Sequence, residues 1–231
     1  MSRKREFFWI LTLFALSNLQ SLARDLGPAI SSAPQKQPET SYLVKPGPSI
    51  TVLVYNHALL PMTTLVEPRE RASLIFRKAG VEIEWVDCPL NDEERSLYPG
   101  CPEVINRAKL FLRIFPRTAA SKGEAGQAFV AARIANIFWN RVEERAQALK
   151  APASRLLAHT VAHELGHLLL GSHSHSPAGI MSAHWDAEVM VRICQEGLYF
   201  NGQQSELIRS ELRKREGQER VAENPQLMAQ R

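Results

Sequence analysis

The sequence of 231 residues has little of several features that define whole classes of protein. Its three cysteines form no Cys-x-x-Cys pair, which argues against a structural zinc knuckle. It shows no internal repeats and no long low-complexity tract. The formal net charge is only +4 and basic residues are interspersed with acidic ones, as in Arg69-Glu70-Arg71, so no nucleic-acid surface is predicted. With 45% hydrophobic and 23% charged residues, the composition is that of one folded domain.

The first residues carry the features of a secretory signal peptide. The basic residues 3–5 precede an apolar run from Phe7 to Leu16, and residues 21–23 supply the small side chains that a signal peptidase reads. The apolar run is shorter than the ~20 residues needed to cross a bilayer, which disfavours the alternative, a membrane anchor. We therefore expect a secreted or periplasmic protein, cleaved near Ala23, with no stable membrane insertion afterwards.

The rest of the chain divides by composition. Residues 24–48 are rich in proline among serine, glutamine and glycine and have few large apolar side chains, which predicts a linker. We expect the folded domain to span residues 49–216. Residues 217–231 are predicted to form a flexible tail.

The three cysteines fit an oxidising compartment. Cys88 and Cys101 flank a turn-rich segment that contains Pro89, Asn91, Asp92, Pro99 and Gly100. A disulfide there would close a short loop and stabilise the domain by about 3 kcal/mol. Cys194 is then left over, and we expect it to be a buried thiol in the core.

The hydrophobic periodicity of the domain changes type several times, which predicts an α/β (α+β) fold. Alternating and β-branched runs predict strands, and apolar residues at helical spacing predict helices. The expected strands are 50–55, 81–86 and 109–115, with one or two more at 128–130 or 135–139. The expected helices are 67–79, closed by Gly80, then 141–149 and 206–216.

The segment that indicates function is a further helix, predicted from an N-cap at Ser154 to Leu170 and stopped by Gly171. It carries His163-Glu164-Leu165-Gly166-His167. Residues at i and i+4 project from one face of a helix, so the two imidazoles can bind one Zn²⁺. Glu164 is offset from that face and would not be a ligand, but it could reach a zinc-activated water as general base. Hydrolysis of peptide bonds is the reaction expected of such a site.

After this helix come His173, His175 and Gly179-Ile180-Met181. From Ala158 to Trp185 the sequence resembles the metzincin clan of zinc peptidases, in particular matrixin-like ones, whose signature is His-Glu-x-x-His-x-x-Gly-x-x-His followed by a turn with Met.

The resemblance implies roles for four residues. His163 and His167 match two zinc ligands, Glu164 matches the base, and Met181 matches the Met-turn residue beneath the metal. It also implies a metzincin-like zincin fold, with a small mixed twisted sheet, a backing helix, an active-site helix and a C-terminal helical subdomain.

The sequence departs from the family pattern at one position, because Leu170 stands where the family has glycine and Gly171 follows one place later. Two residues therefore compete for the role of third ligand. His173 keeps the family's offset from His163, whereas His175 allows for a helix that continues one residue further, by ~1.5 Å and 100°.

Other residues carry weaker signals. His184 and Trp185 follow the Met turn and are candidates for a substrate subsite, and Tyr199 is a candidate oxyanion donor although a packing role is expected. His57 and His159 are expected to have ordinary packing or surface roles.

Two alternatives to this zinc endopeptidase stay open. A gluzincin-type peptidase would take its third ligand from Glu188 or Glu196. A non-catalytic exported protein would keep only the scaffold. The partner predicted is a peptide or protein substrate.

Overall fold

The computed structural model describes residues 47–102, 109–117 and 123–223. The predicted signal peptide and almost all of the predicted linker therefore lie outside the described residues, and so do residues 224–231. None of the described helices is both long enough and apolar enough to cross a membrane.

A five-stranded sheet forms the centre of the domain, in the order β2-β1-β3-β5-β4. All neighbouring strands are parallel except β4, which runs antiparallel to β5 at one edge. The strands are β1 (Ser49–Tyr55), β2 (Glu82–Asp87), β3 (Leu110–Phe115), β4 (Gly126–Phe129) and β5 (Ile134–Phe138). This mixed sheet with its helices confirms the predicted α/β class.

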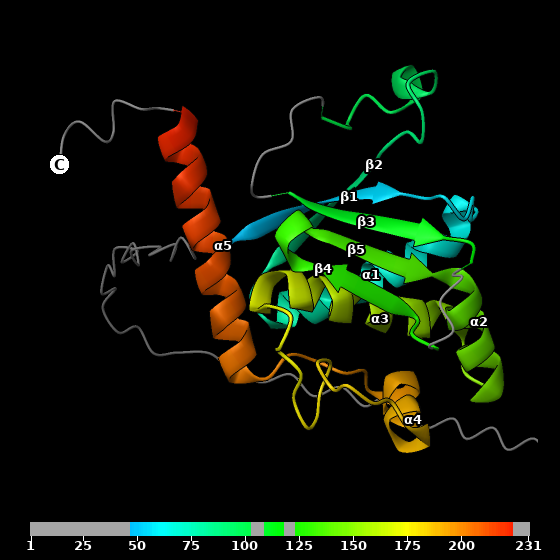
Figure 1. Cartoon of the computed structure of the whole chain (residues 1–231). Helices are drawn as coiled ribbons and strands as arrows, with labels where there is room; N and C mark the ends of the chain where they lie inside the picture. Colours follow the sequence, from blue (N-terminus) through cyan, green and yellow to red (C-terminus); the bar gives the residue numbers. More distant parts are fainter. Residues whose placement is uncertain (1–46, 103–108, 118–122, 224–231) are drawn as a thin grey trace, which may run out of the picture. The chain divides into compact units, whose positions relative to one another are not determined.

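The helices surround one face and the ends of this sheet (Figure 1). They are α1 (Met62–Lys78), α2 (Trp139–Ala148), α3 (Ala153–Leu170), α4 (Ala187–Gln195) and α5 (Gly202–Glu223), with short 3₁₀ turns at Arg95–Leu97 and Val130–Ala132.

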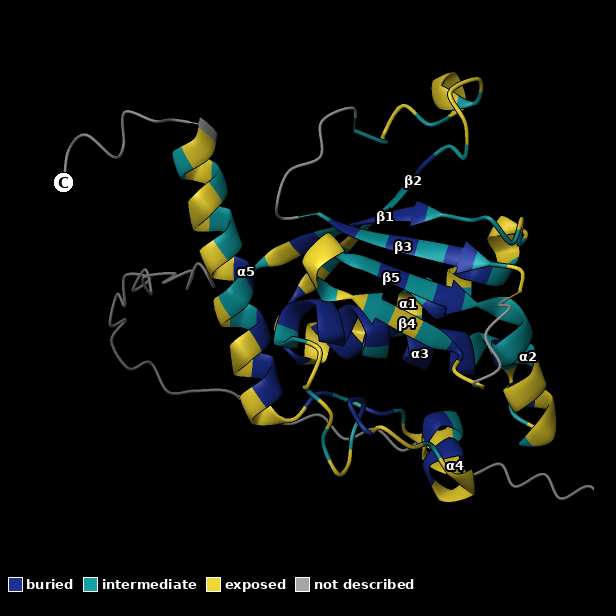
Figure 2. Ribbon diagram, viewed as in Figure 1, coloured by how far each residue is buried: buried dark blue, intermediate teal, exposed yellow. Residues whose placement is uncertain are grey.

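The core lies between the sheet and the helices α1 and α3. Strand β3 shows why, because alternate residues point to one face. Leu110, Leu112 and Ile114 are buried there against the helices, whereas Phe111 and Phe115 on the other face are only half-buried. Figure 2 shows the same division, with dark blue concentrated on the strands and on α3. Helix α3 is therefore fixed by burial on nearly all sides.

Helix boundaries differ most from the sequence prediction in α1 and α5. Helix α1 begins at Met62 and not at the predicted residue 67. It contains Pro68, and because proline has no N–H it usually stands in the first turn of a helix. The closing helix α5 passes Gly217 and continues to Glu223, since isolated glycine is tolerated inside an otherwise helical pattern.

The predicted N-cap of α3 is also wrong. The cap position is Pro152, and the Ser154 hydroxyl instead donates to Glu67 Oε2 over 2.7 Å. The predicted stop is confirmed, because Gly171 ends the helix at φ 99°, where glycine has no steric penalty.

The predicted disulfide between Cys88 and Cys101 is present, and it closes the loop that follows β2. Cys194 has no disulfide partner and is only half-buried, so the prediction of a core thiol is wrong. Its place near the end of the amphipathic helix α4 leaves part of the residue exposed.

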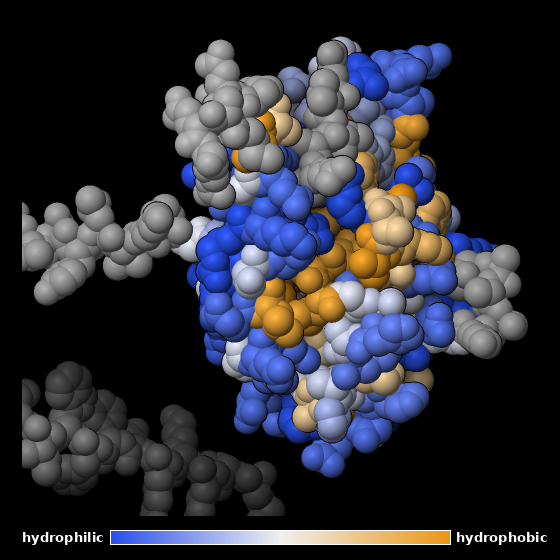
Figure 3. Space-filling view, turned by 60° about the vertical axis from the view of Figure 1, so that its left-hand side comes forward, coloured by the Kyte–Doolittle hydropathy of each residue, from blue (hydrophilic) through white to orange (hydrophobic). Residues whose placement is uncertain are grey.

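The face seen in Figure 3 is mostly hydrophilic, with an apolar patch near its middle. Large exposed apolar side chains occur on several elements, among them Leu59, Val66, Leu97 and Leu207. Singly exposed side chains of this kind are normal in folded proteins and indicate no particular partner.

Candidate metal centre and active site

Helix α3 places two imidazoles side by side. His163 and His167 are one helical turn apart, so their side chains leave the same face, and their ring centroids are 4.7 Å apart. Most other residues of the helix are buried, including Leu165 and Leu168, which cannot leave the core. The orientation of both histidines is therefore set by the packing of α3.

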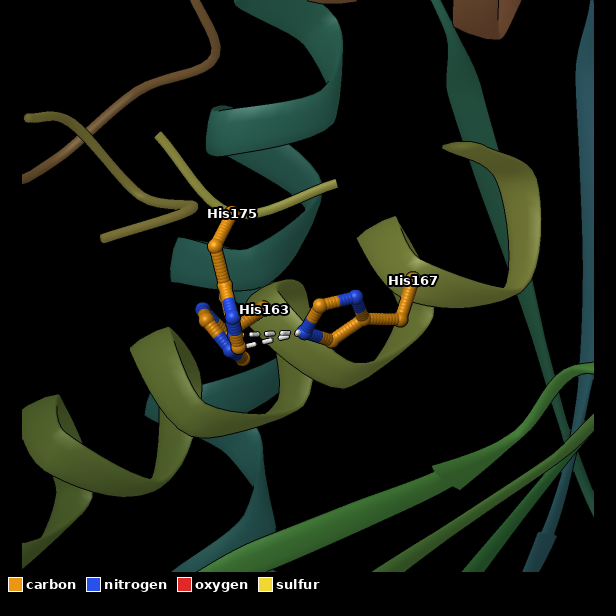
Figure 4. A group of neighbouring side chains, drawn as sticks. All are labelled: His163, His167 and His175. Atoms are coloured by element: carbon orange, nitrogen blue, oxygen red, sulfur yellow. Dashed lines mark hydrogen bonds between the residues drawn. The ribbon is translucent and has the colours of Figure 1, made fainter. Parts of the chain in front are cut away.

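The third imidazole comes from the loop after Gly171. His175 Nε2 lies 3.1 Å from His167 Nε2, which in turn lies 3.1 Å from His163 Nε2 (Figure 4). The ligand atoms of these three residues all lie within 4.8 Å of one another. Within the described ranges, His173, Glu188 and Glu196 do not join this group.

Hydrogen bonds at the far side of each helix-borne ring fix which nitrogen carries the proton. His163 Nδ1 lies 2.7 Å from the Ile180 carbonyl oxygen, which can only accept, so Nδ1 is the donor. Ser174 Oγ donates to the Gly171 carbonyl over 2.7 Å and thus accepts from His167 Nδ1, at 2.9 Å. The Nε2 atoms of both rings therefore carry lone pairs that face one another.

Burial keeps these imidazoles neutral. It lowers the pKa of His163 to about 4, against the opposing effect of the bond to Ile180, and it lowers the pKa of His167 as well. Two neutral nitrogens 3.1 Å apart with facing lone pairs repel each other unless a cation lies between them.

The donor set fits zinc. Ligands about 2.0–2.1 Å from a tetrahedral ion lie about 3.3–3.4 Å apart. The two distances from His167 Nε2, 3.1 Å each, are close to this spacing. Three imidazoles are also a donor set that leaves a fourth position open for water or substrate, as catalytic zinc sites require. The structure thus contains a three-histidine group that could bind Zn²⁺.

The turn that contains Met181 packs against helix α3 beside His163. Met181 is fully buried, and a Cβ at Gly166 would lie 2.6 Å from Met181 Sδ and 2.9 Å from Phe200 Cε1. Glycine inside the His-Glu-x-x-His helix is therefore what lets the turn approach α3. The same turn supplies the Ile180 carbonyl oxygen that accepts from His163 Nδ1.

Glu164 faces a cavity of about 270 Å³ that it shares with the three histidines. The residue is 7% exposed, and burial, with a smaller contribution from the charge of Glu124, raises the pKa of its carboxyl group to about 8. A divalent cation bound at the neighbouring imidazoles would lower this pKa again. A buried carboxyl beside a cation site is a typical general base.

Strand β4 forms one wall of the cavity, and one edge of β4 pairs with no described strand. Ala125 accepts from Phe138 N over 2.9 Å, so in the antiparallel ladder the backbone groups of Gln127 also face β5. Those of Gly126 and Ala128 point the other way, where no described strand pairs with them. The cavity is thus bordered by backbone donors and acceptors that an extended peptide could use.

Trp185 takes part in the site as the sequence suggested, whereas His184 does not. Trp185 lines the cavity and packs edge-on against His163, with ring centroids 5.6 Å apart. His184 is exposed and lies outside the lining. The Tyr199 hydroxyl donates to the Glu196 carbonyl over 2.8 Å, away from the cavity lining, which fits a packing role.

The remaining histidines are structural. His57 stacks on Phe115 with ring centroids 4.8 Å apart. His159 is 1% exposed, its Nε2 accepts from Leu198 N over 3.1 Å, and its Nδ1 contacts the Arg155 carbonyl oxygen at 2.7 Å. It therefore joins α3 to the segment after α4 rather than pointing to water.

Two contributors to the site lie outside the predicted motif. Ser174 carries only a weak signal, as a hydroxyl residue between two candidate ligand histidines. Gly126 is 38 positions before Glu164 in the sequence, and the packing of β4 against α3 brings them together.

No protein-family model matches the chain, and no curated protein matches it either. Among solved structures, a zinc-dependent peptidase from Methanocorpusculum labreanum is 16% identical with a TM-score of 0.47, over 68% of this chain and 99% of that one. An archaemetzincin from Methanopyrus kandleri is 17% identical with a TM-score of 0.48, over 74% and 99%. Likenesses this weak carry no argument about the site, whose interpretation depends on its own geometry.

Proposed function

We propose that the chain is an exported zinc-dependent endopeptidase in which His163, His167 and His175 hold the metal and Glu164 is the general base. The observation that carries this proposal is the convergence of three imidazole Nε2 atoms beside a buried carboxyl group, in a cavity bordered by a strand edge that no described strand covers. The pattern is that of a matrixin-like peptidase whose helix is one residue longer before the glycine.

Each group of residues has a separate role in the proposed hydrolysis. Bound zinc would polarise the substrate carbonyl and lower the pKa of a water molecule toward about 7. Glu164 accepts a proton from the attacking water as the new C–O bond forms, and delivers it to the amine nitrogen as the C–N bond breaks. An extended substrate would pair with the outward backbone groups of Gly126 and Ala128, which holds the scissile bond near Glu164.

Glutamine at position 164 tests the proposal, because Glu164→Gln keeps the size of the side chain and removes its basicity. We expect hydrolysis of a broad peptide library to fall by at least about 10²-fold at neutral pH. Zinc content, measured by mass spectrometry on the purified protein, should stay at the wild-type level.

Variants of the two alternative ligands serve as matched controls. Glu188→Gln and Glu196→Gln should keep both metal and turnover, and loss of zinc from either would favour the gluzincin-type site instead. If the wild-type protein binds zinc and cleaves nothing in the library, a non-catalytic binding protein becomes the better interpretation.

Export is part of the same proposal. It is supported by the basic and apolar start of the sequence and by the disulfide between Cys88 and Cys101, a bond typical of oxidising compartments. Mass spectrometry of protein recovered outside the cytoplasm should find an N-terminus near residue 24, and full-length protein confined to the cytoplasm would contradict export.

A further inference from the structure

We propose that Gly126 is a positioning residue for Glu164, and that the missing side chain at position 126 is what allows the Glu164 carboxyl group to lie in the cavity. The proposal deepens the function proposed above, since it concerns the placement of the general base. It also makes a purely structural statement that does not require the protein to be a peptidase.

The geometry leaves no room for a methyl group at this position. A Cβ at Gly126 would lie 2.6 Å from Glu164 Cγ, 2.7 Å from its Oε1 and 2.9 Å from its Cδ. Non-bonded carbon atoms pack about 3.5–4.0 Å apart, so one of the partners would have to move by about 1 Å.

Strand β4 is the less mobile of the two partners. Gly126 is paired with Ile137 of β5, and the preceding residue, Ala125, is buried and accepts the bond from Phe138 N. Moving the strand would break these contacts. The Glu164 side chain can yield by rotation about its own bonds, because no hydrogen bond from the described residues holds its carboxyl group.

The consequence is a substitution that leaves the fold intact and displaces the base. Alanine suits a strand interior at least as well as glycine does, so the backbone of β4 gains no strain. The three atoms nearest to the added methyl group all belong to Glu164, so its closest clashes fall on the general base and not on the metal ligands. A misplacement of about 1 Å in a reacting group can cost about 10²-fold in rate.

The test compares Gly126→Ala with Gly123→Ala, a control in the same segment where an added Cβ meets nothing within 4 Å. We expect Gly126→Ala to keep the zinc content and the melting temperature of the wild type while kcat falls by about 10²-fold and KM changes little. Gly123→Ala should match the wild type in all four measurements.

A double-mutant cycle separates positioning from a general structural role. In the Glu164→Gln background the base is already absent, so adding Gly126→Ala should lower the residual rate by less than about 3-fold. A structural defect in β4 would instead lower both backgrounds by the same factor. Equal factors would overturn the proposal, and so would a Gly126→Ala variant as active as Gly123→Ala.

A crystal structure of Gly126→Ala gives a readout that does not depend on activity. We expect the Glu164 carboxyl group to have turned away while His163 and His167 stay in place. If the wild type cleaves no peptide, the proposed function fails, but the displacement of Glu164 still decides the positioning role. An unmoved Glu164 carboxyl group beside the new methyl group at position 126 would disprove it.

Discussion

The two regions that supply the histidines are built in opposite ways. Helix α3 is buried along most of its length, and its two ligand candidates are fixed by helical geometry and core packing. The loop that follows is largely exposed, and His175 itself is exposed. A few bonds hold the loop, among them Ser176 N to the Met181 carbonyl at 2.9 Å and Gln204 Nε2 to Ser176 Oγ at 3.1 Å.

The difference indicates how the site is preorganised. The helix presents His163 and His167 whether or not a metal is bound, because removing them from their positions would mean unpacking the core. The loop has little burial to fix it, so bound metal should contribute a larger part of its order. Substitutions in the loop should therefore lower mainly the metal affinity. Substitutions on the helix should lower the folding stability as well.

The largest expected effect separates the two loop histidines. His175→Ala removes one of three converging donors, and we expect zinc affinity to fall by more than about 100-fold, beyond what loss of an outer hydrogen bond causes. His173→Ala is the matched control and should leave affinity close to the wild-type value. Competition with a chromophoric chelator measures both. The opposite result, with His173 needed and His175 dispensable, would show that the loop rearranges when metal binds.

The second-largest expected effect is a loss of folding stability at low pH, caused by the buried imidazole of His159 on helix α3. Burial lowers its pKa to about 4 in the folded protein, from an ordinary value of 6.5. The neutral form is thus favoured by folding, so the stabilisation is complete above pH 6.5 and is lost as the pH falls from 6.5 toward 4. Between about pH 7 and pH 5 the unfolding free energy should drop by about 2 kcal/mol from this residue.

His159→Gln checks this expectation, because glutamine does not titrate. Urea unfolding of both proteins at about pH 7 and pH 5, with a chelator present to remove bound metal, isolates the contribution of position 159. The variant should start less stable at neutral pH and lose about 2 kcal/mol less on acidification. Equal losses in the two proteins would mean that His159 stays neutral in the unfolded chain or takes up a proton in the folded one.

The same contrast explains what the sequence could and could not predict. Helical spacing was enough to place His163, Glu164 and His167 and to stop α3 at Gly171, because local periodicity determines these relations. It could not choose between His173 and His175, since the path of an irregular loop depends on tertiary bonds such as that of Ser176 to Met181.

Contacts between residues far apart in the sequence could not be predicted either. The fit of Glu164 beside Gly126 and the bond from Leu198 N to His159 join residues 38 and 39 positions apart, and no periodic pattern marks them. Ser154 shows the converse, because its local cap signal was overridden by a tertiary partner, Glu67.

The smallest expected effect tests whether the loop does more than supply His175. The Ser174 hydroxyl accepts from His167 Nδ1 and donates to the Gly171 carbonyl, so it orients a helix-borne ligand from the loop side. Such outer partners typically change metal affinity by about 10–100-fold. We expect Ser174→Ala to weaken zinc binding by about 10-fold, the lower end of that range. The reason is that the Gly171 carbonyl lies 3.3 Å from the same nitrogen and can take over part of the bond.

Two further serine variants make the Ser174 measurement decisive. Ser174→Thr keeps the hydroxyl and should recover most of the affinity. Ser172→Ala removes a hydroxyl from an exposed position two residues earlier in the same loop, and it should leave zinc affinity unchanged because Ser172 is not part of the histidine group. If Ser174→Ala binds zinc as tightly as Ser172→Ala, packing of α3 alone orients His167, and the two regions are energetically independent apart from His175.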